Sequence, residues 1–187
     1  MKKIKNFLPE DVANSLFLMG NSIIDGTNKN KYNFWTNKIW QPQLVKDSSL
    51  VLCIKLEDDL HIKVIKSLID NNIISKEDFL NNVYNIGAAL YIWTKESYIS
   101  LHSDKKSDKA LTVYLNKDWD VVDGGLFLWN NQEDDEWKVV VPEFNLSIIN
   151  ENNLDHMTTP VKANEKIRMT LQVFLSKKEK EKNGNTY

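Results

Sequence analysis

Residues 167–175, Ile-Arg-Met-Thr-Leu-Gln-Val-Phe-Leu, alternate between apolar and mostly polar side chains. Successive side chains of a β-strand point to opposite faces of a sheet, so the alternation predicts a strand with two different faces. One face is apolar throughout. The other face carries Arg168, Thr170, Gln172 and Phe174.

Residues 110–116 repeat this alternation, with Leu111 and Val113 on the apolar face and Tyr114 on the other. Two arrangements account for such strands. In an ordinary half-exposed antiparallel sheet, the polar face meets water. In the inverted arrangement, helices cover the apolar face, and the polar side chains line an interior that surrounds a polar ligand. The alternation alone leaves both open.

Further strands are predicted before and between these two stretches of the sequence. From about residue 88, short β-type runs are separated by polar turns: 88–93, 98–102, 110–116, 125–129, 138–141, 145–149 and 167–175. So many short strands in one half of a chain predict a sandwich or barrel. The first half predicts a buried strand at 50–56 and helices at 9–19, at 58–70 and after a capping box at 75–78. Helices followed by strands favour an α+β fold.

Composition excludes several classes of protein. The 187 residues are 42% hydrophobic and 27% charged, which suits a globular domain. The formal net charge of -2 argues against a general nucleic-acid binder. Cys53 is the single cysteine, so neither an internal disulfide nor a cysteine-rich zinc site can form. No apolar run reaches the roughly 20 residues of a membrane helix, and we expect a cytoplasmic protein without membrane partners.

The chain has only three histidines, and two of them fit a metal site. In His102-Ser103-Asp104, residues i and i+2 of an extended backbone point to the same side, so both side chains can bind one ion. His156 lies between two β-runs. Two histidines and one carboxylate form the facial triad of non-heme Fe(II) oxygenases. His61 lies on the predicted helix 58–70 without a partner motif, and we expect it to have a packing or surface role.

Three further segments carry a resemblance to a known family. Residues 114–120 read Tyr-Leu-Asn-Lys-Asp-Trp-Asp, and Gly124-Gly125 follows. Residues 156–161 read His-Met-Thr-Thr-Pro-Val, and Arg168 opens the last predicted strand. Together with His-x-Asp, these segments resemble the 2-oxoglutarate- and Fe(II)-dependent dioxygenases, specifically the prolyl 4-hydroxylase branch with the oxygen-sensing enzymes and their bacterial relatives. The similarity covers about residues 89–175.

The resemblance implies a fold and a domain arrangement. The fold is a double-stranded β-helix, a jelly-roll or cupin-like core, supported by N-terminal helices. Residues 1–176 would form a single domain, with mainly helical support over 1–87 and the core with the site over 88–176. The lysine- and glutamate-rich end, 177–187, has no apolar anchor, and we expect it to be a disordered tail.

The resemblance also implies roles for individual residues. Fe(II) would be held by His102, Asp104 and His156. The distal carboxylate of 2-oxoglutarate would be bound by Arg168 and Tyr114, and Tyr91 would line the same pocket. A guanidinium suits a carboxylate because it offers two parallel donors.

The sequence departs from the family pattern at two places. Tyr98 lies near a second expected pocket tyrosine, but its spacing to His102 is one residue too long. The segment between His156 and Arg168 is also long, which makes Lys166 an alternative partner for 2-oxoglutarate. Arg168 is preferred because the strand after it keeps the family distance to a terminal aromatic residue.

The expected function is hydroxylation of prolyl residues in a peptide or protein. Fe(II), 2-oxoglutarate and O2 would be required, ascorbate is a further candidate requirement, and succinate and CO2 would be co-products. Asp104 favours hydroxylation, because the halogenating members of the superfamily lack this carboxylate. Two alternatives stay open: the same chemistry on a free amino acid or another side chain, and a jelly-roll binding module without turnover.

Three aromatic residues near Pro42 have no assigned role. Phe34, Trp35 and Trp40 precede it in a predicted loop and fit either a substrate-gripping lid or a hydrophobic plug. Cys53 lies among aliphatic residues and is expected to be a small core side chain rather than a reactive thiol.

Overall fold

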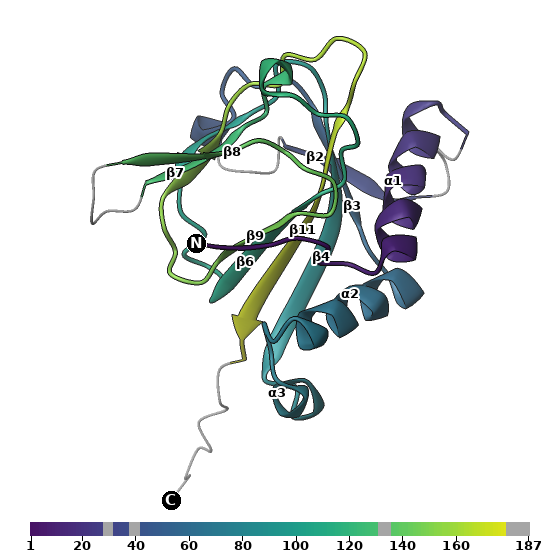
Figure 1. Cartoon of the computed structure of the whole chain (residues 1–187), viewed down its shortest axis with the longest axis vertical. Helices are drawn as coiled ribbons and strands as arrows, with labels where there is room; N and C mark the ends of the chain where they lie inside the picture. Colours follow the sequence, from purple (N-terminus) through teal and green to yellow (C-terminus); the bar gives the residue numbers. More distant parts are fainter. Residues whose placement is uncertain (28–31, 38–41, 131–135, 179–187) are drawn as a thin grey trace, which may run out of the picture.

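The computed structural model describes residues 1–27, 32–37, 42–130 and 136–178. Within these ranges the chain forms two antiparallel sheets that face each other, as Figure 1 shows. The large sheet has the strand order β1 (Lys2–Ile4), β9 (Ser147–Asn150), β6 (Lys109–Tyr114), β11 (Arg168–Lys177), β4 (Tyr84–Trp93), β3 (Val51–Lys55) and β2 (Phe34–Thr36). The small sheet has the order β5 (Ile99–His102), β10 (His156–Thr158), β7 (Phe127–Asn130) and β8 (Trp137–Val140).

The described residues form three α-helices, of which two lie on the outer side of the large sheet and the short third one lies near the start of β4 (Figure 1). They are α1 (Glu10–Ile24), α2 (Asp58–Asp70) and α3 (Lys76–Leu80), and two short 3-10 helices, η2 (Pro42–Leu44) and η3 (Val121–Asp123), lie in connections. The helix α2 has the predicted bounds, and the predicted capping box of α3 is formed by Ser75 and Asp78. The two sheets and the N-terminal helices confirm the α+β jelly-roll prediction.

The helix α1 differs from its prediction. The expected helix ends at residue 19, just before Gly20, a residue type common at helix ends, whereas the observed helix continues to Ile24. Gly20 is buried, and a Cβ atom there would overlap the sulfur of Met169. The glycine therefore allows α1 to lie close against β11, and the conformational freedom that suggested a helix end is not used.

The main hydrophobic core lies between the helices and the large sheet. It includes side chains from α1, α2 and the apolar faces of β6 and β11, such as Leu16, Leu68, Leu111, Val113, Met169, Leu171, Val173 and Leu175. The apolar residues of β11 thus face the helices. Arg168 and Thr170 on its opposite side are also buried, which is the inverted arrangement.

Three strands were absent from the sequence prediction. The strands β1, β2 and β10 have three residues each, too few to show a period of two. β1 pairs with β9 and β2 pairs with β3, so the N-terminal half contributes strands as well as helices to the fold. The division of residues 1–176 at residue 87 stays a prediction.

The last described residues, 177 and 178, belong to the strand β11 or follow it directly. β11 ends at Lys177, and the amide of Lys178 donates to the carbonyl of Val83. Residues 179–187 of the predicted tail lie outside the described ranges. Among the helices of those ranges, none combines the length and the apolar character that crossing a bilayer requires.

Candidate metal centre

The structure brings His102, Asp104 and His156 together at one edge of the small sheet. His102 is the last residue of β5, and His156 is the first residue of β10. The two strands are antiparallel neighbours, and these histidines are direct partners in their register. Asp104 follows β5 by two residues. The His102-Ser103-Asp104 motif and the distant His156 therefore lie together because the end of β5 pairs with the start of β10.

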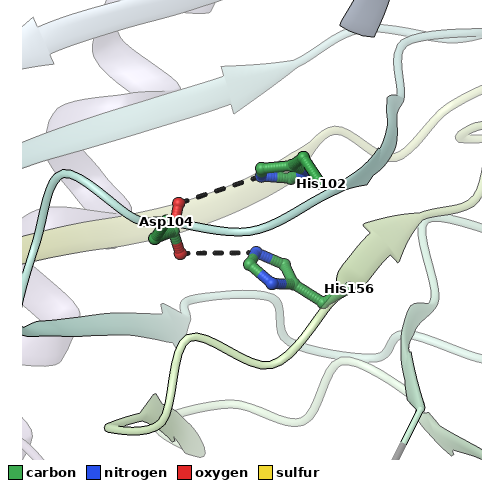
Figure 2. Close-up of side chains that lie close together, drawn as sticks. All are labelled: His102, Asp104 and His156. Carbon is green, nitrogen blue, oxygen red and sulfur yellow. Dashed lines mark ion pairs between the residues drawn. The ribbon is translucent and has the colours of Figure 1, made fainter. Parts of the chain in front are cut away.

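The geometry of the cluster suits one metal ion. Figure 2 shows both carboxylate oxygens of Asp104 turned toward the imidazoles. The Nε2 atom of His102 lies 3.9 Å from Oδ1, and the Nε2 atom of His156 lies 3.4 Å from Oδ2. One donor atom from each residue lies within 4.8 Å of the others. Two imidazoles and a carboxylate on one side of an ion match the facial triad of non-heme iron sites.

Backbone carbonyls set the orientation of both imidazoles. The Nδ1 atom of His102 lies 2.8 Å from the carbonyl oxygen of Ser100, and that of His156 lies 3.0 Å from the carbonyl of Leu154. A carbonyl only accepts, so Nδ1 carries the proton in both rings. Each Nε2 then carries a lone pair directed toward Asp104. This is the tautomer in which an imidazole can bind a metal through Nε2.

His156 is the more deeply buried of the two imidazoles. Its ring stacks on Phe127, with centroids 5.1 Å apart and an interplanar angle of 24°. Burial lowers the pKa of His156, against the attraction of the Asp104 carboxylate, and the neighbouring His102 lowers it further. His156 is therefore neutral at neutral pH and ready to bind a cation.

Arg168 lies in the space between the sheets. It is 1% exposed, its Nε donates to the carbonyl of Gly125 at 2.9 Å, and its Nη1 has no hydrogen-bond partner among the described residues. The guanidinium carbon lies 4.5 Å from the ring centroid of Trp93 and 5.5 Å from that of Tyr114. Burial lowers the pKa of Arg168 to about 10, so the side chain still carries its charge at neutral pH.

Tyr114 offers a second unused donor beside Arg168. Its side chain is fully buried, and its hydroxyl interacts with the Arg168 guanidinium but has no other hydrogen-bond partner among the described residues. Burial raises the pKa of Tyr114 to about 12, although the Arg168 charge opposes this shift, so the hydroxyl keeps its proton. Buried polar atoms in native proteins are nearly always satisfied. A guanidinium N–H and a hydroxyl left free side by side are the donors that a buried carboxylate requires.

Tyr91 lies on the same interior face. It pairs with Thr170 in the sheet, its ring lies 6.2 Å from that of Trp93, and its hydroxyl contacts the Cys53 sulfur. Burial raises the pKa of Cys53 to about 12, which leaves the thiol protonated and unreactive. Tyr91 therefore lies on the same interior face as Arg168, next to Trp93.

The donor pair and the metal cluster share one apolar surround. Phe127, which stacks on His156, packs in the same buried cluster as Tyr114, whose ring lies beside Arg168. The described residues thus place three metal-type ligands and two carboxylate-type donors on neighbouring parts of one interior. These residue types fit Fe(II) and a small organic diacid.

Several other candidates lie outside this arrangement. Lys166 pairs with Asp123 at 2.7 Å on the surface, which leaves Arg168 as the buried cation. Tyr98 is half-buried and precedes β5. His61 lies on α2, on the opposite side of the large sheet from Arg168. None of these three belongs to the cluster of metal-type ligands.

The aromatic residues of the first half are only partly described. Phe34 and Trp35 form part of the edge strand β2, and Trp35 packs against the buried cluster that contains Tyr91 and Trp93. This packing accounts for Trp35. Trp40 lies outside the described residues.

Sequence reasoning gave no role to the residues that hold these side chains in place. Gly125 supplies the carbonyl that binds Arg168, and Trp93 supplies the ring beneath the guanidinium. Asn116 and Asn150 bind backbone atoms next to Arg168 and His156. Asn116 lies in the quoted segment 114–120 and two residues after the end of β6, but nothing in the residue type says which carbonyl it meets.

Comparisons with known proteins were made by sequence and by structure. No protein-family model matches the chain, and no curated protein matches it by sequence. Solved structures do match. A prolyl-4-hydroxylase from Pseudomonas putida is 12% identical with a TM-score of 0.71, and the match covers 95% of this chain and 92% of that one.

Two further structures widen the comparison. A prolyl hydroxylase from Trichoplax adhaerens, solved with a peptide fragment of the hypoxia inducible factor oxygen degradation domain, is 16% identical with a TM-score of 0.64, over 94% of this chain and 83% of that chain. SnoN, a non-heme alpha-ketoglutarate-dependent epimerase of nogalamycin biosynthesis, is 7% identical with a TM-score of 0.64, over 94% and 76%. The chain therefore has the fold shared by 2-oxoglutarate- and Fe(II)-dependent oxygenases, prolyl hydroxylases among them.

Proposed function

We propose that the protein is an Fe(II)- and 2-oxoglutarate-dependent dioxygenase that hydroxylates prolyl residues in a peptide or protein. The observation that carries the proposal is the pair of free, buried donors on Arg168 and Tyr114 beside an apolar cluster that also holds His156. A buried guanidinium without an anion is costly, so the pocket is built for a negatively charged ligand. The cluster of His102, Asp104 and His156 supplies the metal ligands.

The residues of the chain would divide the work. His102, Asp104 and His156 would hold Fe(II) through the two Nε2 atoms and the carboxylate. Arg168 would pair with the 2-oxoglutarate carboxylate that is remote from the metal, with the Tyr114 hydroxyl donating to the same carboxylate. The two unused donors would then both be satisfied, and the positive charge would be neutralised.

Bound Fe(II) and 2-oxoglutarate supply a known chemistry. O2 gives one oxygen atom to succinate and one to the hydroxylated product, and 2-oxoglutarate loses CO2. The protein contributes the position of the ligands and a dry interior around them. Phe127 and Trp93, packed against His156 and Arg168, form part of this dry surround.

The prolyl substrate is the finer part of the proposal. It is supported by the sequence resemblance of residues 114–125 and 156–161 and by two prolyl hydroxylases among the structural neighbours, one of them with a peptide. Fold alone does not fix a substrate. We also propose a cytoplasmic location, since the single cysteine is free and buried, as in proteins of reducing compartments.

The experiment that tests the chemistry is succinate release from 2-oxoglutarate with Fe(II) and ascorbate. We expect turnover by the wild type, its loss in His102→Ala and in Asp104→Ala, and its retention in His61→Ala, a histidine outside the cluster. Equal turnover in all three variants would contradict the assignment of the metal ligands. Binding of 2-oxoglutarate without any succinate would indicate a binding module instead.

A second experiment tests the substrate. Proline-containing peptides, the same peptides with alanine in place of proline, and free proline are incubated with the active enzyme and analysed by mass spectrometry. We expect a gain of one oxygen atom only on the proline-containing peptides. Oxygen on free proline alone would support a free amino acid substrate, and oxygen on neither would refute the prolyl assignment while leaving the succinate result in place.

A further inference from the structure

Three buried asparagines use their side-chain amides in the same way. Asn116, Asn145 and Asn150 are each 4% exposed. Each donates from Nδ2 to one backbone carbonyl and accepts at Oδ1 from one backbone amide, within a single short segment. We call this arrangement an asparagine clamp. An amide that makes both bonds substitutes for a rung of sheet pairing and holds its segment at a fixed place.

The clamp at Asn150 leads to the metal centre. Its Nδ2 donates to the carbonyl of Leu154 at 3.1 Å, and its Oδ1 accepts from the amide of Leu154 at 3.0 Å. The same Leu154 carbonyl accepts from Nδ1 of His156 at 3.0 Å. Both lone pairs of this oxygen are therefore used, one by the clamp and one by the imidazole.

The need for this clamp follows from a difference between the two histidines. His102 donates to Ser100, which lies within the strand β5 between two residues that pair with β10, Ile99 and His102. His156 donates to Leu154, which lies in the connection between β9 and β10 and outside any strand. Without Asn150, the Leu154 amide would lose its hydrogen-bond partner and the Leu154 carbonyl would keep only the bond from His156. The remaining support would be the packing of the Leu154 side chain against the cluster that contains Phe127, and the bond from the Asn130 amide to the Asp155 carbonyl.

The clamp at Asn116 leads to the carboxylate donors. Its Nδ2 donates to the carbonyl of Ile167 at 2.8 Å, and its Oδ1 accepts from the amide of Met169 at 3.1 Å. These two residues flank Arg168. The strand β6 ends at Tyr114. The side-chain amide of Asn116 therefore continues the hydrogen bonding to β11 beyond the last residue pair, on both sides of Arg168.

The side-chain clamp at Asn145 contacts neither group, and the bond from its backbone amide to the Tyr114 carbonyl does not involve the side chain. Its side-chain amide binds both the N–H and the carbonyl of Leu8, at 2.9 and 2.8 Å, and so attaches the N-terminal segment to the sheet. The burial and the type of bonding are the same as in the other two clamps. Asn145 is therefore an internal control for the effect of losing a buried amide.

We infer that Asn150 and Asn116 are positioning residues for two different ligands: Asn150 orients His156 for the metal, and Asn116 holds Arg168 for 2-oxoglutarate. The inference rests on the proposed function. It predicts a separation that a purely structural role would not produce, because each variant should weaken one ligand and spare the other.

The test measures binding rather than turnover. Mn(II), a redox-stable substitute for Fe(II), is titrated into the metal-free protein by calorimetry, and 2-oxoglutarate is then titrated into the Mn(II)-saturated protein. The variants are Asn150→Ala, Asn116→Ala and Asn145→Gly. Glycine is used at 145 because this residue has a φ of 61°, where a Cβ is strained.

We expect Asn150→Ala to weaken Mn(II) binding by about ten-fold, the scale of outer-shell changes at metal sites, with 2-oxoglutarate affinity kept. Asn116→Ala should weaken 2-oxoglutarate binding by about ten-fold, since small displacements of a binding group are costly, with Mn(II) affinity kept. Asn145→Gly should keep both affinities and lower only the melting temperature.

Two results would overturn the inference while leaving the proposed function intact: wild-type affinities for both ligands in all three variants, or equal losses of both ligands in all three. A wild-type protein that binds neither Mn(II) nor 2-oxoglutarate would overturn the proposed function as well. If the alanine variants do not fold, Asn150→Ser and Asn116→Ser keep a neutral polar side chain that is too short to make both bonds. The same expectations apply to these two variants.

Discussion

Arg168 carries a positive charge in a buried position where no described carboxylate pairs with it. It has one hydrogen bond to a carbonyl and two aromatic faces, and it is almost fully buried. A carboxylate placed against Nη1 would supply the missing partner. Under the proposed function, the residue serves ligand binding at a cost in stability, and its replacement should separate the two.

We expect Arg168→Met to melt at the wild-type temperature or above it when no ligand is present, because an apolar side chain of similar length removes a buried, unpaired charge. With Mn(II), 2-oxoglutarate at a hundred times its dissociation constant should stabilise the wild type by about 2.7 kcal/mol. It should not stabilise the variant. Thermal unfolding with and without 2-oxoglutarate measures both effects, and Arg168→Lys, which keeps the charge without the planar fork, should give a smaller ligand shift.

His156 should give the metal-free protein a pH-dependent stability. Burial is the largest cause of its lowered pKa, so between the folded value and the unfolded value of about 6.5 the unfolded state binds more protons. The free energy of unfolding should therefore fall as the pH drops below about 6.5, by at most about 1.4 kcal/mol per pH unit for one proton. Urea titrations from pH 7.5 to 5 measure it, with His156→Gln as the reference. A steeper loss in the variant than in the wild type would contradict the assignment.

At the scale of elements, the turn that leads from η3 into β7 determines where Arg168 can lie. Gly125 has a φ of 61°, and a Cβ on it would lie 2.5 Å from Cδ of Arg168. Its carbonyl is also the acceptor for Arg168 Nε. The glycine in this turn therefore serves both the backbone conformation and the side chain packed against it.

Gly125→Ala should lower the free energy of unfolding by about 1–3 kcal/mol, the range for strain at a positive φ, and should also weaken 2-oxoglutarate binding by displacing Arg168. Gly87→Ala is the matched control. Gly87 lies in β4 with open space where the Cβ would be, so its stability should change little. Calorimetric binding and chemical unfolding of both variants check this, and normal 2-oxoglutarate affinity in Gly125→Ala would contradict the role of the turn.

The elements that could be predicted from the sequence are those with a regular period. The alternation of residues 110–116 and 167–175 gives β6 and β11 within two residues of their observed ends, and α2 follows from its amphipathic stripe. The strands of three residues could not be predicted, because their existence depends on a distant partner. β1, for example, is formed by pairing with residues 147–149.

The candidate site divides in the same way. His102 and Asp104 follow from local spacing, and His156 and Arg168 from the resemblance, since nothing local connects them to the motif. The groups that orient them are backbone carbonyls of Ser100, Gly125 and Leu154. Every residue has a carbonyl, so residue type carries no information on which one will be used.

At the scale of the whole molecule, the main hydrophobic core joins the helices to the outer face of the large sheet. Leu171 is fully buried in it, near the centre of β11 and directly after Thr170, which lies on the interior face. Leu171→Ala should lower the free energy of unfolding by about 2–5 kcal/mol through the cavity that it creates.

Leu80→Ala provides the comparison, because Leu80 is 70% exposed on α3. The same change of side chain there should alter the free energy of unfolding by less than about 0.5 kcal/mol. Denaturant unfolding of both variants measures the contrast. Similar losses in the two would show that the apolar face of β11 does not form the central part of the core.

In β11, the central strand of the large sheet, odd-numbered and even-numbered residues lie on different faces. From Met169 to Leu175, odd positions face the helices and hold the molecule together, while the even positions lie on the opposite face, which begins with the buried Arg168 and Thr170 and continues with the half-buried Gln172 and Phe174. Substitutions at Gln172 and Phe174 can therefore be combined in a mutant library without exchanging a single helix-facing side chain. Such a library would let selection for a new substrate proceed on one side of a strand while the other side keeps the protein folded.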